Sequence, residues 1–490
     1  MSRKRVIIDC YTDEPAGLGV PPFLGVWARY ASGRYRDLPV YLTIDDLRLA
    51  KSKKEFKNPD FDPPAGKTRI DLINHTRTQQ QVREILEDAD QAIIIAGVQT
   101  PGKYLSARPG TLSEIRKLLS GYKFTRVLTG PAAVCGTQLR GGVRAETADP
   151  EIFNQIRQTD FKNYKHLQPA ALKGAQILKQ IPQRRVIEIE TGRGCRREVG
   201  CSFCTEPLKG KPEWREADDI IEEVKKIRQL GAEWFRLGKQ ACIFSYQNGD
   251  IEQLKKLLQG ISKTKPKVLH IDNADPEMVT QQRAKIFAEY LTAGSAAAMG
   301  AESFDEKVIK ANNLNSTSEA VFEAVRILTR IGGKRGENGC PQILAGINIL
   351  LGLEGETRET LEKNFAALKK MLDKGLLIRR INIRQVVAFK GTRLHRRVGN
   401  KVLRKNRKYY AKWIEKIRNE IDLPMLKRVF PEGTILRGLI SEVHQGQITF
   451  LRQPGSYPIV VGVRERLPLG ETFDVKITDH MLRSLTGEIT

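Results

Sequence analysis

Three cysteines lie close together near the middle of the 490-residue chain, at Cys195, Cys201 and Cys204. Residues 185–190, directly before them, are rich in β-branched side chains and predict a short strand. The cysteines therefore follow the carboxyl end of a strand on a Gly-rich loop, where open α/β sheets and α/β barrels place their chemistry. Three thiolates on one loop can bind three irons of a 4Fe–4S cubane and leave the fourth iron open to another ligand. The loop therefore predicts an iron–sulfur site.

Other uses of these cysteines are less compatible with the pattern. Cys201 and Cys204 are too close in the chain for an unstrained disulfide, and a charged loop with several glycines is poor core. A zinc knuckle needs a fourth ligand, and neither His nor Cys follows nearby. The remaining cysteines are scattered singly and form no disulfide framework; Cys135 and Cys340 among them are expected to be ordinary buried residues.

The cysteine loop resembles the cluster loop of the radical S-adenosylmethionine (radical SAM) superfamily, including an aromatic residue, Phe203, just before the last cysteine. The usual spacing in that superfamily has three residues between the first two cysteines, whereas this chain has five, 196–200. The resemblance implies that the open iron chelates the amino and carboxylate groups of SAM. It also implies that reductive cleavage of SAM gives a 5′-deoxyadenosyl radical.

Residues 184–395 predict six strand–helix units, which together make a partial (β/α)6 barrel. The strands are expected at residues 185–190, 233–237, 268–273, 297–303, 345–351 and 380–389. By the resemblance, the loops at the carboxyl ends of these strands bind SAM. The expected contacts are Phe203, backbone groups of Gly238 and Lys239 for the amino group, Glu302 and Ser303 for the ribose or amino group, and Gly352 behind the adenine.

Residues 1–145 alternate strands with helices and predict a doubly wound, flavodoxin-like α/β domain. Strands are expected at residues 6–9, 40–44, 92–98 and 126–130, a helix at 23–30, and a ligand crevice between the loops 10–22 and 99–109. The domain is similar to the N-terminal domains of cobalamin-binding radical SAM enzymes and of methylthiotransferases. Methylthiotransferases carry three further cluster cysteines there, but Cys10 is the only cysteine before Cys135 in this chain.

One 4Fe–4S cluster is therefore expected, with the N-terminal domain binding cobalamin or substrate. A domain without any cofactor stays an open alternative. Residues 146–183 predict a helical linker.

Basic residues outnumber acidic ones strongly in a helical segment, 396–432. The cations expected to contact RNA phosphates are Arg396, Arg397, Arg404, Lys405, Arg407 and Lys408. Tyr409, Tyr410 and Trp413 lie between them and could stack on unpaired bases. The alternative is a solvated basic helix whose aromatic residues pack inward. The whole chain carries 82 Lys and Arg against 57 Asp and Glu, a net charge of +25, which favours a polyanionic partner.

Residues 433–490 predict short strands with glycines at the turns, which is typical of a small β-barrel of the OB type. The last segment, 476–488, resembles the TRAM domain, a tRNA-binding barrel appended to methylthiotransferases. The chain has no apolar run of about 18 residues and no signal-peptide core, so no membrane partner and a cytoplasmic location are expected.

The sequence thus predicts a radical SAM enzyme that modifies RNA, above all tRNA, by methyl or methylthio-type group transfer, with an electron donor for its cluster. One alternative is a cobalamin-dependent methylase or rearranging enzyme whose substrate is a protein or a small molecule. Another is an RNA-binding protein in which the cluster is structural.

Overall fold

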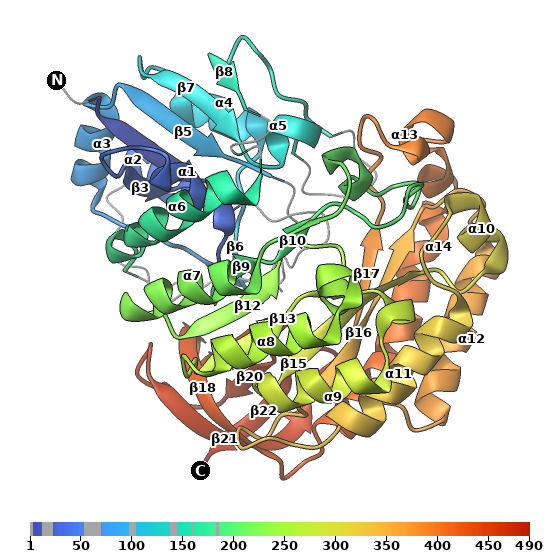
Figure 1. The fold of residues 1–490 in the computed structure, drawn as a ribbon. Helices are drawn as coiled ribbons and strands as arrows, with labels where there is room; N and C mark the ends of the chain where they lie inside the picture. The colour runs from blue at the N-terminus through green and yellow to red at the C-terminus, as the bar shows by residue number, and fades with distance from the viewer. Residues whose placement is uncertain are drawn as a thin grey trace. The chain divides into compact units, whose positions relative to one another are not determined.

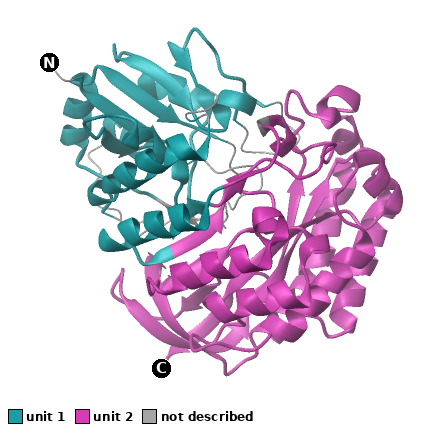
Figure 2. Ribbon diagram, viewed as in Figure 1, with its two compact units in different colours: residues 1–140, 144–190, 215–234 teal, residues 141–143, 191–214, 235–490 magenta. Residues whose placement is uncertain are grey.

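The structure, a computed structural model, describes the chain except for residues 1–2, 12–22, 53–69, 98–103, 138–144, 158–160, 162 and 183–185. The chain divides into two compact units (Figure 2). Unit 1 comprises residues 1–140, 144–190 and 215–234, and unit 2 comprises residues 141–143, 191–214 and 235–490. The domain boundaries expected after residues 145, 183, 395 and 432 remain predictions.

Unit 1 is built on a parallel five-stranded sheet with the strand order β3-β1-β5-β7-β8 (Figure 1). Its strands are β1 (Arg5–Asp9), β3 (Val40–Thr43), β5 (Gln91–Ile95), β7 (Thr125–Thr129) and β8 (Gln155–Ile156). Numbered along the chain this order is 2-1-3-4-5, which is the flavodoxin-like arrangement. The central strand β5 is buried along its whole length, as a parallel strand covered on both faces must be. The predicted doubly wound sheet is therefore confirmed.

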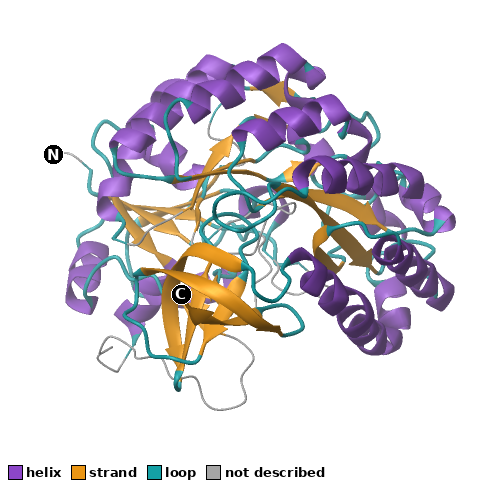
Figure 3. Cartoon of the chain, turned by 90° about the horizontal axis from the view of Figure 1, so that it is seen from below, coloured by secondary structure: helices purple, strands orange, loops and turns teal. Residues whose placement is uncertain are grey.

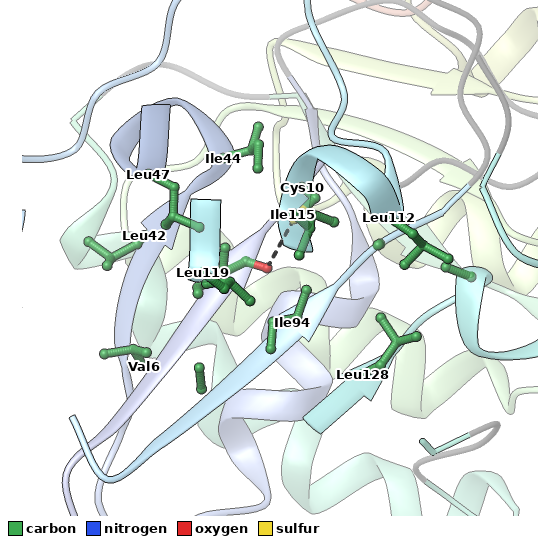
Figure 4. Close-up of a cluster of buried hydrophobic side chains, with 14 of the residues drawn as sticks. Val6, Cys10, Leu42, Ile44, Leu47, Ile94, Leu112, Ile115, Leu119 and Leu128 are labelled. Atoms are coloured by element: carbon green, nitrogen blue, oxygen red, sulfur yellow. Dashed lines mark hydrogen bonds between the residues drawn. The ribbon is translucent and has the colours of Figure 1, made fainter. Parts of the chain in front are cut away.

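The helices of unit 1 are α1 (Val26–Gly33), α2 (Ile44–Lys51), α3 (Gln79–Glu87), α4 (Leu112–Leu119), α5 (Ala132–Cys135), α6 (Tyr164–Gly174) and α7 (Ala217–Gln229). Helices α2 to α5 share one apolar cluster with the strands of this sheet, whereas α6 packs on α1, and α7 packs on α6 and β9. Figure 4 shows Ile115 and Leu119 of α4 beside Ile94 of β5 in one apolar cluster. Short strands β4 (Ile70–Leu72) and β6 (Tyr104–Ala107) pair separately.

The helix expected at 23–30 begins later, at Val26. The first two residues of that stretch form strand β2 (Phe23–Leu24) instead, which pairs in parallel with β9 (Val186–Glu190). Much of the expected crevice, in the loops 10–22 and 99–109, lies outside the described residues.

Strand β9 is the first of the six strands predicted for the partial barrel, and unit 2 holds the other five. They are β12 (Trp234–Gly238), β13 (Val268–Ile271) with its short continuation β14 (Asn273–Ala274), β15 (Ser295–Glu302), β16 (Ile343–Leu351) and β17 (Ile378–Gln385). Strands β14 to β17 are parallel neighbours in chain order, and β13 lies beside β12. Asp272, between β13 and β14, links both parts, because its N–H donates to the Leu237 carbonyl and its carbonyl accepts from Ala298.

Most helices of unit 2 lie outside this strand layer, and the short helix after the last strand, residues 393–397, bonds to the cysteine loop instead (Figure 1). The helices are α8 (Ile251–Ser262), α9 (Gln281–Tyr290), α10 (Glu306–Asn312), α11 (Ser318–Gly332), α12 (Arg358–Asp373), α13 (Arg393–Arg397), α14 (Lys401–Ile417) and α15 (Leu423–Val429). This alternation is that of the predicted partial (β/α)6 barrel, whose first strand, β9, is counted with unit 1.

The last 56 or so residues form a closed five-stranded barrel, as predicted. Its strands are β18 (Ile435–Gln445), β19 (Ile448–Arg452), β20 (Val460–Val463), β21 (Thr472–His480) and β22 (Leu485–Ile489). The barrel closes in the order β18-β19-β20-β22-β21 and carries the C-terminus (Figure 3). Across the described part of the chain, no helix has the length and apolar character needed to cross a membrane.

Candidate metal centre and ligand-binding loops

The cysteine loop starts from a short antiparallel hairpin directly after β9. Strand β10 (Gly192–Arg193) pairs with β11 (Glu213–Trp214), so the loop leaves and returns at one place. A Cβ added to Gly192 would lie 2.5 Å from the Trp214 ring, which is why this position requires glycine. Thr191, just before the hairpin, donates its N–H to the Gly238 carbonyl (3.3 Å). The base of the loop is therefore fixed to the end of β12.

The three cysteines are free, half-buried thiols. Burial raises the pKa of the Cys201 thiol to about 11, and the nearby Glu302 carboxylate adds to that rise. Burial also raises the pKa of Cys204, followed by the charges of Glu206 and Cys201. Burial and neighbouring negative charges thus keep Cys201 and Cys204 protonated, and a positively charged inorganic group would favour their thiolates, because metal binding deprotonates its ligands.

The number of thiols separates a cluster from a single zinc ion. A structural zinc site takes four ligands, whereas this loop offers three thiols, which is the number that leaves one iron of a 4Fe–4S cluster open. Hydrogen-bond donors also point at them, such as the Glu206 N–H at 3.4 Å from the Cys204 Sγ. The donor set therefore fits a 4Fe–4S cluster.

The five residues between the first two cysteines are held on both sides. The Arg196 guanidinium pairs with Asp275 at 2.9 Å. The Arg197 guanidinium donates to the Asn313 carbonyl (2.8 Å), and the Asn313 side chain donates back to the Val199 carbonyl (2.6 Å). The long spacing thus forms an ordered, cross-linked turn.

A buried asparagine, Asn312, connects the cysteine loop to the rest of the site. Its carbonyl and its Oδ1 accept from the N–H and hydroxyl of Ser202, at 2.8 and 2.6 Å. Its Nδ2 donates to the Glu354 carbonyl (2.8 Å) in the loop after β16. Sequence reasoning did not identify Asn312 or Asn313. The signal was the Asn pair at the end of a helix, since asparagine often supplies the left-handed residue there and Asn313 has φ 49°.

The loop after β12 presents backbone and side-chain donors beside the cysteine loop. Lys239 is left-handed (φ 68°), directly after Gly238, whose carbonyl accepts from Thr191. The Gln240 Oε1 accepts from the Thr191 hydroxyl (2.8 Å), whereas the buried Gln240 Nε2 has no hydrogen-bond partner among the described residues. A buried donor without a partner is costly and marks this loop as a ligand contact. The resemblance predicted backbone contacts from residues 238–240, but no role for the Gln240 side chain.

Glu302 and Ser303, at the end of β15, differ in whether their side chains make hydrogen bonds within the described structure. Glu302 has φ 57°, and its carboxylate makes no hydrogen bond or ion pair with the residues that the structure describes. Burial raises its pKa to about 8, while the Arg384 charge acts in the opposite direction. The Ser303 hydroxyl, in contrast, donates to Asn364 (3.3 Å) and accepts from the Asp305 N–H (3.2 Å). Ser303 therefore supports the fold rather than offering a free hydroxyl.

The loop after β16 is fastened to helix α14. Gly352 (φ 93°) donates its N–H to the Glu356 carboxylate (2.9 Å), and an added Cβ there would lie 2.6 Å from Leu403. The same carboxylate accepts from the Tyr410 hydroxyl and from the Asn406 Nδ2. The N–H of Gly352 is thus used by the fold, while Phe203, in the cysteine loop, is half-exposed.

The basic segment presents its cations outward and its aromatic residues inward. Six side chains predicted to contact RNA are all exposed: Arg396, Arg397, Arg404, Lys405, Arg407 and Lys408. Tyr410 and Trp413 are 2% and 4% exposed, and the Trp413 Nε1 donates to the Leu361 carbonyl. The expectation that these two rings could stack on bases is therefore wrong, because both pack against the barrel helices. Tyr409 is half-buried.

A second group of potential ligands lies on the C-terminal barrel. Glu432, Asp479 and His480 have ligand atoms within 4.8 Å of one another. The His480 Nε2 already bonds to the Phe430 carbonyl (2.6 Å), and both acids are exposed. This histidine attaches the barrel to the end of α15.

Several known proteins are similar to this chain in sequence. The sequence model of the Radical SAM superfamily matches residues 189–368. The uncharacterised protein MJ0274 of Methanocaldococcus jannaschii is 41% identical, in an alignment that covers 100% of this chain and 94% of its own. A match of 21% identity, over 61% of this chain and 66% of the relative, is to ribosomal protein uS12 methylthiotransferase RimO of Clostridioides difficile. The tRNA-2-methylthio-N(6)-dimethylallyladenosine synthase of Endomicrobium trichonymphae is 22% identical over 71% of this chain and 81% of its own.

Among solved structures, the radical SAM methyltransferase TsrM from Kitasatospora setae, with cobalamin and a 4Fe–4S cluster bound, superposes with a TM-score of 0.51. The alignment covers 80% of this chain and 77% of that one at 14% identity. At that identity the likeness concerns the fold alone.

Proposed function

The chain belongs to the radical SAM superfamily, and on that premise we propose that it modifies RNA, above all tRNA, by transfer of a methyl-derived or methylthio-type group. The enzyme class requires a 4Fe–4S cluster and SAM, and its relatives include methylthiotransferases. When bound, the cluster supplies the electron that cleaves SAM. Its electron donor and a cytoplasmic place of action stay predictions.

The residues of the chain take complementary parts in this proposal. Cys195, Cys201 and Cys204 hold the cluster. Backbone groups at Gly238 and Lys239 bind the amino group of SAM, as the resemblance implies, and the unsatisfied Nε2 of Gln240 offers a donor to its carboxylate. The open carboxylate of Glu302 is an acceptor for the amino group or ribose hydroxyls. Gly352 and Ser303 hold their loops in place through bonds to Glu356 and Asn364.

The exposed cationic face of α14 is the observation that most supports RNA as the substrate. Arg404, Arg407 and Lys408 are spaced at i, i+3 and i+4, so they share one side of the helix. Neither they nor the adjacent Lys405 make an ion pair with any residue that the structure describes. Unpaired like charges repel one another and attract a polyanion, and phosphate neutralisation by Lys and Arg is independent of base sequence.

Binding of labelled tRNA tests the surface directly. We expect the variant R404Q/R407Q/K408Q to lose affinity and to lower the slope of log K against log salt by about 0.7–0.9 for each phosphate contact removed. The matched control K255Q/K256Q/K263Q neutralises three lysines of the α8 region and should bind as the wild type does. Equal affinity of both variants and the wild type, at all salt concentrations, would point to a protein or small-molecule substrate.

Nucleoside mass spectrometry tests the reaction itself. RNA from a strain without this gene should lack one modified nucleoside, which the wild-type gene restores and a gene encoding C195A does not. A complete set of modified nucleosides in the deletion strain would contradict the proposal. The ribosomal-protein methylthiotransferase among the relatives makes protein the next substrate class to examine.

A cobalamin-dependent version of the reaction is a second candidate. It is supported by the flavodoxin-like strand order of unit 1, because such sheets bind ligands where the strand order reverses, here between β1 and β5. The fold likeness to a methyltransferase solved with cobalamin agrees with this reading. Incubation with hydroxocobalamin, followed by gel filtration, should leave a corrinoid spectrum on the protein. A protein fraction free of corrinoid would leave substrate binding as the role of unit 1.

A further inference from the structure

The two adjacent arginines in the long cysteine spacing have different partners. Arg196 turns to carboxylates, at 2.9 Å from Asp275 and 3.4 Å from Glu277. Arg197 makes no ion pair with a carboxylate of the described residues. Its guanidinium lies instead 3.5 Å from the Cys201 Sγ and donates to the Asn313 carbonyl at 2.8 Å. One cation of this turn is therefore neutralised locally, whereas the other faces a sulfur.

The position of the Arg197 guanidinium is fixed by its surroundings. The Asn313 carbonyl holds one end, and the Asn313 side chain binds the turn itself through the carbonyls of Val199 and Gly200, at 2.6 and 3.3 Å. A Cβ on Gly200 would lie 2.2 Å from the Pro207 ring, so the turn has no room to move in that direction. The guanidinium is thus presented to Cys201 by an ordered frame.

We propose that Arg197 is a positioning residue for the cluster ligand Cys201, and that the two extra residues of the cysteine spacing serve to bring its positive charge to the cluster. The proposal rests on the assignment of the cluster to the three cysteines. One-electron reduction adds a negative charge to the cluster, and a charge-assisted hydrogen bond to a ligand sulfur stabilises the more negative state. Hydrogen bonds to the sulfurs and net charge are among the factors that set cluster potentials. Arg197 therefore raises the reduction potential and eases electron entry.

Redox titration of the reconstituted holoenzyme, followed by electron paramagnetic resonance, tests this role without measuring turnover. In R197Q we expect the ratio of reduced to oxidised cluster, at a fixed potential, to fall about tenfold, which corresponds to 59 mV for one electron. R197K retains the charge and should fall between R197Q and the wild type. R196Q changes the same charge one residue away and should titrate as the wild type does.

Iron content separates the two levels of failure. About four irons in all variants, with equal potentials for R197Q, R196Q and the wild type, would overturn the role of Arg197 alone. Equal shifts in R196Q and R197Q would assign the effect to net charge and would also overturn it. A wild-type protein that takes up no cluster would instead refute the proposed function.

A second measurement does not depend on the variants. Pulsed electron paramagnetic resonance of the reduced cluster should show a hyperfine coupling to nitrogen. This coupling should differ between wild-type enzyme with unlabelled arginine and wild-type enzyme whose arginine guanidinium carries ¹⁵N. No coupling to labelled arginine would exclude the contact with Cys201, even if R197Q failed to assemble a cluster.

Discussion

At the scale of single residues, the site contains groups whose pKa values differ from their ordinary values. The thiols of Cys201 and Cys204 have raised pKa values because burial disfavours the thiolate. A bound cluster compensates for that burial with its own positive charge. Cluster assembly is consequently coupled to loss of the thiol protons, and each cysteine matters separately.

Substitution of any one of the three cysteines should therefore prevent stable assembly. We expect C195A, C201A and C204A each to lose most of the iron and the visible absorption near the cluster band after anaerobic reconstitution. The wild-type protein should hold about four irons per chain, because the remaining cysteines cannot supply three ligands to a second cubane. C340A, which removes a buried cysteine of the same unit, is the control and should keep four irons. About eight irons in the wild type would contradict the single cluster.

Glu302 gives a prediction in which stability and ligand binding move in opposite directions. Burial raises its folded-state pKa to about 8 from an ordinary 4.5, so the folded protein holds this proton more tightly than the unfolded chain does. The resulting stability is complete below pH 4.5 and is lost as the pH rises through 8. E302Q should match the wild type near pH 4.5 and be more stable by about 4 kcal/mol at pH 8, as measured by thermal unfolding of cluster-free protein.

The same variant should bind SAM at least tenfold more weakly at pH 8, since the amide lacks the negative charge. Equilibrium dialysis with reconstituted protein measures this. Parallel curves of unfolding temperature against pH for E302Q and the wild type, across pH 4.5–8.5, would show that burial does not raise the pKa of Glu302.

At the scale of elements, the loop between β19 and β20 joins the C-terminal barrel to strands of the partial barrel. The Ser456 N–H donates to the His270 Nδ1 (3.1 Å), and the Tyr457 hydroxyl donates to Asp272 (3.2 Å). The Tyr457 carbonyl accepts from the Arg379 guanidinium (2.8 Å). Gly455 (φ 128°) lies against the His270 ring, so close that an added Cβ would be 2.4 Å away. The C-terminal barrel is therefore bonded to β13 and β17 by buried polar groups.

Acid should loosen this attachment through His270. Burial lowers its pKa from 6.5 to about 4, so the neutral ring is the folded form and the unfolded chain takes up a proton first. The stability due to the neutral ring is complete above pH 6.5 and is lost as the pH falls toward 4, by up to about 3 kcal/mol. H270N keeps an acceptor near Nδ1 without titrating, so its unfolding curve should change less between pH 6.5 and 4.5. An unchanged pH dependence in H270N would assign the acid lability to other groups.

At the scale of the whole molecule, the sequence predicted the helices and strands better than the side-chain bonds between them. Strands such as β5 and β16 were predictable because continuous apolar runs can only be buried. Local pattern could not reveal that Tyr410 bonds to Glu356, or that Tyr457 bonds to Asp272, since these partners are 54 and 185 residues apart. For the same reason the sequence did not reveal that the Ser303 hydroxyl bonds to Asn364, or that Asn312 bonds to Ser202 and Glu354.

These long-range bonds predict that the C-terminal barrel is not detachable. Deletion of residues 433–490 removes hydrogen-bond partners of the buried His270 and Arg379, and it removes the Tyr457 hydroxyl from Asp272, which stays beside Arg236 (3.8 Å). The loss of a hydrogen-bond partner costs a buried polar group about 1–3 kcal/mol, and a charged group more. That loss is comparable to the whole stability of many domains, so the shortened chain should be insoluble or should unfold at least 10 °C below the wild type. The full-length R404Q/R407Q/K408Q variant should keep the wild-type unfolding temperature, because the three cations are exposed. A shortened chain that stays monodisperse, takes up four irons and unfolds with the wild type would show that the barrel is an independent module.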